Sequence, residues 1–149
     1  MQEIHALSII QPSGELIVRG KKNVENREWK TNKRGFIAIH ASSKYDRNRY
    51  AYFDENYKLA IDPDDVDYGA VIGFAEISDV IQEEDVTRST LKWFEGKYGF
   101  VLKNMIKLPK AVPIQGSMGL WKLGGKDLEK CLLQLPSAQR KLIKENVLQ

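Results

Sequence analysis

Four apolar runs, each about the length of a β-strand, constrain the fold of this chain more than any other feature. They cover residues 4–10, 35–41, 69–80 and 98–107, and polar or turn-forming stretches separate them. Short apolar runs that are bounded in this way are typical of buried strands. Because the runs lie far apart in the sequence, each strand must pair with a distant partner, which predicts a curled sheet or a barrel.

Helical patterns lie between and after these runs. Five segments are predicted to be helical, at residues 15–19, 44–57, 87–95, 127–135 and 137–147. Gly20 is placed where a helix commonly ends, and Pro136 separates the two amphipathic C-terminal segments. Residues 23–29 alternate between apolar and polar side chains, which favours an extended segment after the first helix.

The length and composition describe a single globular domain. The chain has 149 residues, of which 42% are hydrophobic, and this is enough to form one core. Residues 1–149 are therefore predicted to form one α+β domain, a barrel of about five to six strands with flanking helices. Its core is expected over about residues 4–123, and the C-terminal helices over about residues 126–148.

The composition also limits the cofactors and the location that we expect. Cys131 is the single cysteine and His5 and His40 are the two histidines, so we expect no disulfide, no metal site and no cofactor. The acidic loop at residues 62–67 does not have the spacing of an EF-hand calcium site. No apolar run is long enough to cross a bilayer, and the N-terminus has no signal-peptide pattern. We therefore expect a cytoplasmic protein without a membrane partner.

Charge is unevenly distributed along the chain. The net charge is only +3, but residues 19–34 hold seven basic residues against two acidic ones. The basic residues are Arg19, Lys21, Lys22, Arg27, Lys30, Lys33 and Arg34. Acidic residues gather instead at 62–67 and 83–85. Such polarity is compatible with a nucleic-acid partner, although a run of charge taken alone is more typical of a solvated surface loop.

The sequence from Gly20 to Arg27 has the pattern G-x-K-x-x-E-x-R. In an extended segment Glu25 and Arg27 share one face, whereas Lys22 lies on the other unless the glycine turn redirects it. A Glu25–Arg27 pair would hold a guanidinium that suits phosphate, and Lys22 could add a positive charge or, if buried, act as a base. The same residues could instead form an ordinary surface ion pair.

Five segments follow one another along the chain. They are Ala6-Leu7-Ser8-Ile9-Ile10-Gln11-Pro12, the motif at 20–27 with Trp29, Arg34-Gly35 with Ile39-His40-Ala41-Ser42, Gly73-Phe74-Ala75-Glu76, and the segment from Pro113 to Trp121. In this order they resemble the ASCH (activating-signal cointegrator homology) domain family, a relative of the PUA-like barrels. The resemblance covers roughly residues 4–123 and leaves out the C-terminal helices. It implies a β-barrel that binds RNA or another single-stranded nucleic acid.

The resemblance also implies a cleft beside the first helix. Its lining would comprise Gln11, Pro12, Ser13, Lys22, Glu25, Arg27 and Trp29, with His40 and Ser42 nearby. Trp29 could stack on an unpaired base and Gln11 could read a base edge, whereas Trp121 is expected in the core. The phosphate backbone would follow the exposed basic residues Arg19, Lys21, Lys30, Lys33 and Arg34.

Two other functions remain open at this stage. Some family members resemble metal-independent amidohydrolases of acetylated cytidine, but Glu25 occupies the position where they use a threonine. Lys22 and Glu25 could still form an acid–base pair, and Lys22 with His40 and Tyr45 could support RNA cleavage. Alternatively, the C-terminal helices could bind a protein partner or a second copy of the chain. We predict binding rather than catalysis.

Overall fold

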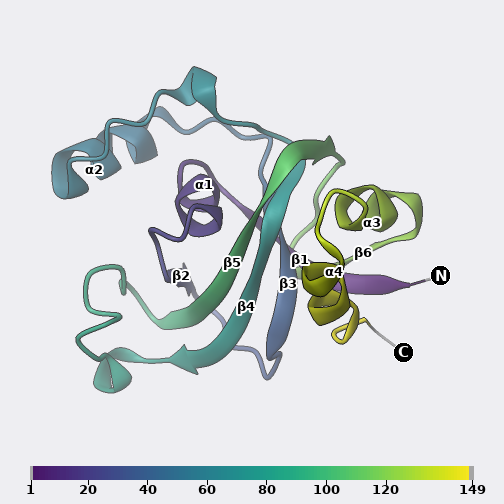
Figure 1. Cartoon of the computed structure of the whole chain (residues 1–149). Helices are drawn as coiled ribbons and strands as arrows, with labels where there is room; N and C mark the ends of the chain where they lie inside the picture. The colour runs from purple at the N-terminus through teal and green to yellow at the C-terminus, as the bar shows by residue number, and fades with distance from the viewer. Residues whose placement is uncertain (1, 148–149) are drawn as a thin grey trace.

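The computed structural model describes residues 2–147, which form one curled sheet with helices on both sides (Figure 1). The helices are α1 (Ser13–Val18), α2 (Arg47–Tyr57), α3 (Gly125–Leu132) and α4 (Ser137–Lys144), with short 3-10 turns at Pro63–Asp65 and Glu83–Asp85. The strands are β1 (Glu3–Ile9), β2 (Val24–Arg27), β3 (Gly35–Ala41), β4 (Ala70–Ile81), β5 (Tyr98–Pro113) and β6 (Leu120–Gly124). No helix within residues 2–147 has the length and apolar character needed to cross a membrane.

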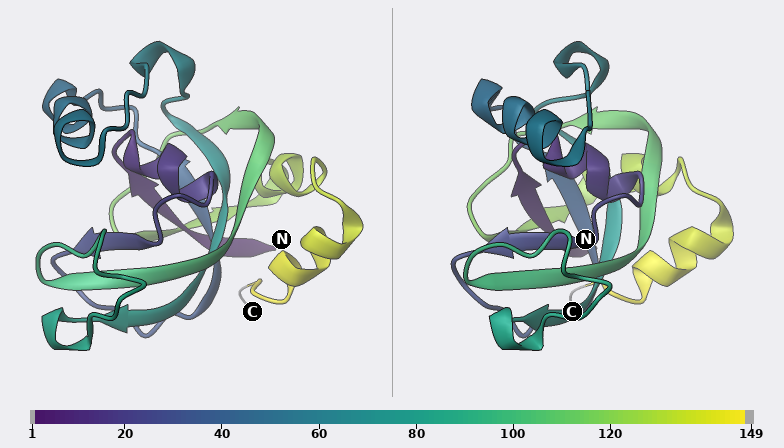
Figure 2. Two further views of the ribbon diagram at one scale, coloured as in Figure 1. Left: turned by 60° about the vertical axis from the view of Figure 1, so that its left-hand side comes forward. Right: turned by 90° about the vertical axis from the view of Figure 1, so that its left-hand side faces the viewer.

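The six strands lie in the order β2-β5-β4-β3-β1-β6. β1 and β3 are parallel, and the other neighbours are antiparallel. Register shifts interrupt the pairing of β4 with both β3 and β5. Because such irregularities increase local bending and twist, the two long strands curl as Figure 2 shows.

The curl brings the two edges of the sheet towards each other without joining them. Within residues 2–147, β2 and β6 form no backbone pairing with one another. Arg27 on β2 spans part of the gap, because its Nη2 donates a hydrogen bond to the backbone oxygen of Ser8 on β1 at 2.8 Å. The predicted α+β barrel-like class is confirmed, with a side chain linking strands where backbone pairing is absent.

Side chains on the two faces of the sheet form separate cores. On β3, Phe36 and Ala38 belong to one core, and Ile37 and Ile39 belong to the other. The C-terminal helices cover the first core, whereas α1 lies inside the curl and contributes to the second. The two amphipathic helices predicted at the C-terminus are therefore present, and most of their apolar side chains are buried against the sheet.

A third core joins α1 and α2 to the segment before β5. Leu16, Val24, Phe53 and Trp93 form its buried part. The helix predicted at residues 87–95 is wrong: residues 88–93 form consecutive turns, and residues 94–95 are irregular. The reason is tertiary, because the Asn26 amide on β2 donates to the Trp93 oxygen and accepts from the Glu95 amide, which holds the chain in a non-helical path.

A candidate nucleic-acid cleft

The glycine turn after α1 decides where Lys22 points. Gly20 has a φ of 76°, and the amides of Lys21 and Lys22 both donate to the oxygen of Leu16. The turn brings Lys22 back towards β2, where its Nζ donates to the backbone oxygen of Val24 and lies 3.4 Å from Glu25 Oε1. The strand alternation alone would have placed Lys22 and Glu25 on opposite faces.

Lys22 is a buried amine, with 3% of its surface exposed. Burial lowers the pKa of Lys22 below its ordinary value of 10.5, and the negative charge of Glu25 opposes this shift. An ammonium group in this position is stable only because a carboxylate and a carbonyl oxygen accept its hydrogen bonds. Glu25 is therefore the neighbour that favours the charged form of Lys22.

Glu25 also holds Arg27, and this predicted pair is present. Arg27 Nε and Nη2 lie 3.1 and 3.0 Å from Glu25 Oε2. Since Arg27 Nη2 also donates to the Ser8 backbone oxygen, the guanidinium is held from two sides. Arg27 is consequently part of the structure that links β2 to β1, as well as part of the site.

Two adjoining hollows meet at this carboxylate, and we call them together the cleft. One is lined by Lys22, Glu25, Asn26, Arg49, Tyr52, Phe53, Trp93 and Glu95. The other is lined by Ser8, Ile10, Glu25, Asn26, Arg27, Glu28, Trp29 and Arg49. The motif at residues 20–27 thus forms the centre of the cleft, and α2 and the segment before β5 form its far wall.

Sequence reasoning missed several residues of the cleft lining, and Arg49 is the basic residue among them. It extends from α2, and its Nη2 donates to the hydroxyl of Ser13 at 3.0 Å. Its buried Nε has no hydrogen-bond partner, and no carboxylate of residues 2–147 lies within ion-pair distance of it. Arg49 lies in a tyrosine-rich surface helix far from the motif, so no local pattern could have assigned it to the site.

Glu95 closes the far wall and is held there by two tyrosines. The hydroxyls of Tyr52 and Tyr57 donate to Glu95 Oε1 at 2.6 and 3.1 Å. Hydrogen bonding to Glu95 raises the pKa of Tyr52, and burial followed by the Glu95 hydrogen bond raises that of Tyr57. Both phenols therefore stay protonated at neutral pH and present neutral aromatic surface beside the cleft.

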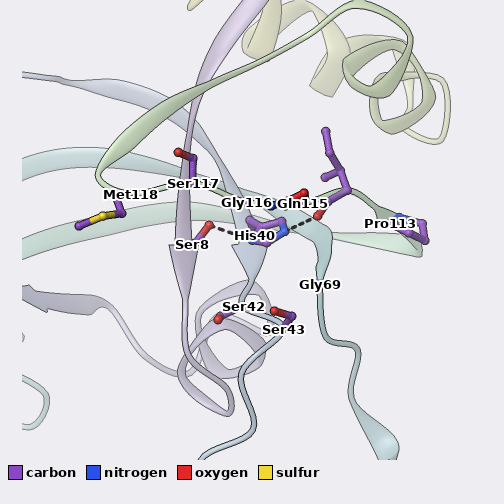
Figure 3. A pocket seen from close by; sticks show the side chains of 11 residues that line it. Ser8, His40, Ser42, Ser43, Gly69, Pro113, Gln115, Gly116, Ser117 and Met118 are labelled. Atoms are coloured by element: carbon purple, nitrogen blue, oxygen red, sulfur yellow. Dashed lines mark hydrogen bonds between the residues drawn. The ribbon is translucent and has the colours of Figure 1, made fainter.

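Next to the cleft lies a third hollow, which we call the His40 hollow (Figure 3). It is lined by Ser8, His40, Ser42, Ser43, Gly69, Pro113, Ile114, Gln115, Gly116, Ser117 and Met118. Ser8 lines both this hollow and the cleft. His40 and Ser42 are therefore near the motif, as expected, but they belong to a separate depression.

Several predicted cleft residues are placed differently. Gln11 is fully buried: its Nε2 donates to the Asp67 oxygen and its Oε1 accepts from the Glu15 amide. Because both ends of the amide are occupied, the predicted reading of a base edge by Gln11 is wrong. Pro12 and Ser13 are also buried, and they support the wall that Arg49 contacts.

The other basic residues predicted to follow a phosphate backbone do not line the cleft. Lys30, Lys33 and Arg34 precede β3, whereas His40 and Ser42 are at the other end of that strand. Arg34 Nη2 lies 3.7 Å from Asp79 Oδ1, and Lys21 is exposed in the turn after α1. A phosphate path along this set therefore stays a prediction.

The aromatic residues considered as site candidates lie in different parts of the molecule. Trp29 is half-buried in the cleft wall, with its ring 5.2 Å from that of Phe100, so one part of it remains available to a ligand. Trp121 packs against the first core as expected. Tyr45 lies against Tyr50 and Tyr68, away from the cleft lining, so the trio of Lys22, His40 and Tyr45 is not assembled.

Residues 2–147 contain no cluster of three or more His, Cys, Asp or Glu side chains suited to a metal ion.

The fold and this cleft define a small α+β domain of the barrel-like PUA-like class. The ASCH domain family profile matches residues 7–110, and the chain belongs to the ASCH domain family. It is similar to activating signal cointegrator 1 from Homo sapiens and from Mus musculus, with 28% identity over 133 residues to each. The match covers 80% of this chain but 22% of those proteins, so the chain spans about a fifth of their length.

A solved structure shares the fold. The crystal structure of ASCH from Zymomonas mobilis aligns with a TM-score of 0.51 and 19% sequence identity. The alignment covers 85% of this chain and 91% of that one. This likeness extends the common fold beyond the residues of the family match.

Proposed function

We propose that the protein binds single-stranded nucleic acid, with RNA as the preferred ligand, by holding one unpaired nucleotide in the cleft. The observation that carries this proposal is Arg49, a guanidinium in the cleft lining without a carboxylate partner. Guanidinium groups bind phosphate through two parallel hydrogen bonds. The phosphate of the bound nucleotide is the group that Arg49 would contact.

The charges of the cleft support one phosphate contact rather than many. Lys22 and Arg27 share Glu25, and Glu28 and Glu95 also line the cleft. The lining therefore has as many carboxylates as basic side chains, since Arg49 is its third basic residue. A ligand that placed many phosphates in the cleft would be repelled by these carboxylates. The exposed edge of Trp29 and the phenol of Tyr52 offer surfaces on which a base can stack, which contributes about 1–3 kcal/mol per base.

The test measures affinity and salt dependence together. Fluorescently labelled single-stranded RNA, single-stranded DNA and duplex RNA are titrated with the protein at several salt concentrations. We expect binding to the single strands and a shallow slope of log K against log salt, close to −0.7 for each phosphate contacted. Arg49→Gln should weaken binding and reduce the magnitude of this slope by about 0.7.

A matched control separates the cleft from general surface charge. Arg140→Gln removes an arginine on α4, on the other side of the sheet, and should leave the affinity unchanged. If Arg49→Gln bound like the wild type, or if Arg140→Gln weakened binding equally, the cleft would not be the binding site. A steep slope that corresponds to many phosphates would contradict the single-nucleotide proposal.

We also propose hydrolysis as the second candidate, and a different observation favours it. The pKa of Lys22 is lowered by burial, and Lys22 lies 3.4 Å from Glu25 at the edge of a hollow. A lysine of lowered pKa beside a carboxylate can exchange a proton with a substrate. Turnover of acetylated cytidine or RNA that is lost in Lys22→Met would support this candidate, and absence of turnover with RNA binding intact would exclude it.

The third candidate, a protein partner or a second copy bound through α3 and α4, has less support. Leu128, Leu132 and Ile143 are buried against the sheet, and Leu133 and Leu142 are the large apolar residues that these helices expose. Light scattering at high concentration tests self-association directly. A monomer at all concentrations would leave only a different protein as the partner of this surface.

A further inference from the structure

A chain of hydrogen bonds in the His40 hollow ends on a serine hydroxyl. His40 Nε2 lies 2.7 Å from the backbone oxygen of Ile114, and His40 Nδ1 lies 2.9 Å from Ser8 Oγ (Figure 3). A carbonyl oxygen can only accept, so Nε2 carries the proton and the unprotonated Nδ1 accepts from the Ser8 hydroxyl. The backbone carbonyl thereby fixes the tautomer that makes Nδ1 a base directed at Ser8.

The imidazole is arranged to receive and return a proton. His40 is 2% exposed, and burial lowers its pKa, so it is neutral at neutral pH. If Nδ1 takes a proton, the Ile114 oxygen still accepts from Nε2 and stabilises the imidazolium. The ring of Trp121 packs edge-on at 5.4 Å and keeps the imidazole in place.

Ser8 is half-buried and lines both the His40 hollow and the cleft. Its Oγ donates to His40 and accepts from Trp121 Nε1 at 3.0 Å, which leaves one lone pair of the oxygen without a hydrogen bond. The backbone runs directly over this pair: a Cβ on Gly116 would lie 2.3 Å from Ser8 Oγ and 2.6 Å from His40 Cε1. Only glycine allows this approach of residues 115–118 to the two side chains.

From this arrangement we infer that Ser8 and His40 form a nucleophile–base pair that hydrolyses small carboxylic esters in the His40 hollow. This activity is separate from the proposed nucleotide binding in the cleft. It uses neither Lys22 nor Arg49. The hollow is open to solvent and has a volume of about 790 Å³, which is ample for a small ester.

The lining of the hollow selects the carboxylic ester over a phosphate ester. Apart from His40 it contains no ionisable side chain, so the negative charges of a phosphoryl group would have no cation beside them. The single oxyanion of an acyl transfer needs only neutral N–H or O–H donors. The amides of residues 115–118 make no hydrogen bond to another backbone group within residues 2–147, and Ser42 and Ser43 also line the hollow.

The reaction proceeds in two balanced halves. Ser8 Oγ forms a bond to the ester carbonyl carbon while its proton passes to His40 Nδ1. The carbonyl then re-forms as the bond to the leaving-group oxygen breaks, and that oxygen takes the proton from His40. A water molecule repeats the same steps on the acyl-serine, which releases the carboxylic acid and restores the Ser8 hydroxyl.

The test uses the intact protein with 4-nitrophenyl acetate as substrate and a fluorophosphonate as a covalent probe. We expect release of 4-nitrophenol and a single probe adduct that mass spectrometry assigns to Ser8. Ser8→Ala should abolish labelling, and both Ser8→Ala and His40→Gln should lower the rate at least about 100-fold. Ser137→Ala, at an exposed serine on α4, should match the wild type.

Labelling of the wild type is decisive even if a variant fails to fold. An adduct on any other serine would overturn the proposal. So would wild-type protein that shows its native circular dichroism but neither labelling nor turnover, because the hydrogen-bond chain would then serve only to join β1, β3 and β6. Ester turnover that persists in folded Ser8→Ala would assign the chemistry to another residue.

Discussion

Replacing Glu25 with glutamine tests whether one carboxylate maintains the charge of the cleft. Glu25 accepts from Lys22, which is 3% exposed, and from Arg27, which keeps a second acceptor in the Ser8 backbone oxygen. Glutamine preserves the volume but removes the negative charge. The main consequence is therefore a buried ammonium group at Lys22 without an anion beside it.

The structure limits how large the loss of stability can be. Removing one partner of a buried ion pair costs about 3–5 kcal/mol. Lys22 can escape this cost by releasing its proton, which costs about 1.4 kcal/mol for each pH unit below its ordinary pKa of 10.5. The loss from Lys22 is therefore at most about 5 kcal/mol at pH 7, and at most about 2 kcal/mol at pH 9.

The sign of the pH dependence follows from the lowered pKa. Burial lowers the pKa of Lys22 in the folded state, so the unfolded chain binds more protons between that pKa and 10.5, and stability rises with pH across this interval. Loss of Glu25 removes the charge that opposes the shift and widens the interval. The difference in stability between wild type and variant should therefore shrink from pH 7 to pH 9.

Urea unfolding of wild type and Glu25→Gln at both pH values measures this difference. Glu129→Gln, at an exposed glutamate on α3, controls for the loss of a surface carboxylate. In a Lys22→Met background, Glu25→Gln should cost less and its cost should vary little with pH. A loss below about 1 kcal/mol at pH 7, or a loss that grows towards pH 9, would refute the assignment of a buried charge to Lys22.

Three further predictions concern other parts of the molecule. Burial raises the pKa of the Cys131 thiol to about 12, so a disulfide reagent should modify it only after unfolding; rapid reaction of folded protein would contradict its placement. Asp46 accepts from the amides of Asn48 and Arg49 at the start of α2, and Asp46→Ala should cost about 1 kcal/mol in urea unfolding. Burial lowers the pKa of His40 below 6.5, so stability should fall by up to about 1.4 kcal/mol per pH unit as the pH drops below 6.5, and His40→Gln should remove this component.

Local patterns predicted the parts of the fold that depend on near neighbours. The apolar run at residues 35–41 is β3, and the run at 69–80 is most of β4, because a strand buried on both faces has few polar side chains. The Glu25–Arg27 pair was predictable for a similar reason, since two residues separated by one other lie on the same face of a strand.

Contacts between distant segments explain why the helix at residues 87–95 and the role of Gln11 were wrongly predicted. A single sequence contains no sign that Asn26 would hold residues 93–95 in turns, or that the amide of Gln11 would be used by the Asp67 oxygen and the Glu15 amide. Both outcomes depend on side-chain hydrogen bonds across loops. Such bonds override the local preference for a helix or an exposed amide.

The candidate site likewise depends partly on local sequence and partly on contacts between distant segments. The sequence by itself determined the strands, the glycine turn and a motif in which Lys22, Glu25 and Arg27 could meet, because these depend on local geometry and on alternation. The tertiary structure alone decided that Arg49 would join the cleft and that Ser8 would meet His40. The curl of the sheet and its register shifts set those distances, and they result from the packing of two cores that involve the whole chain.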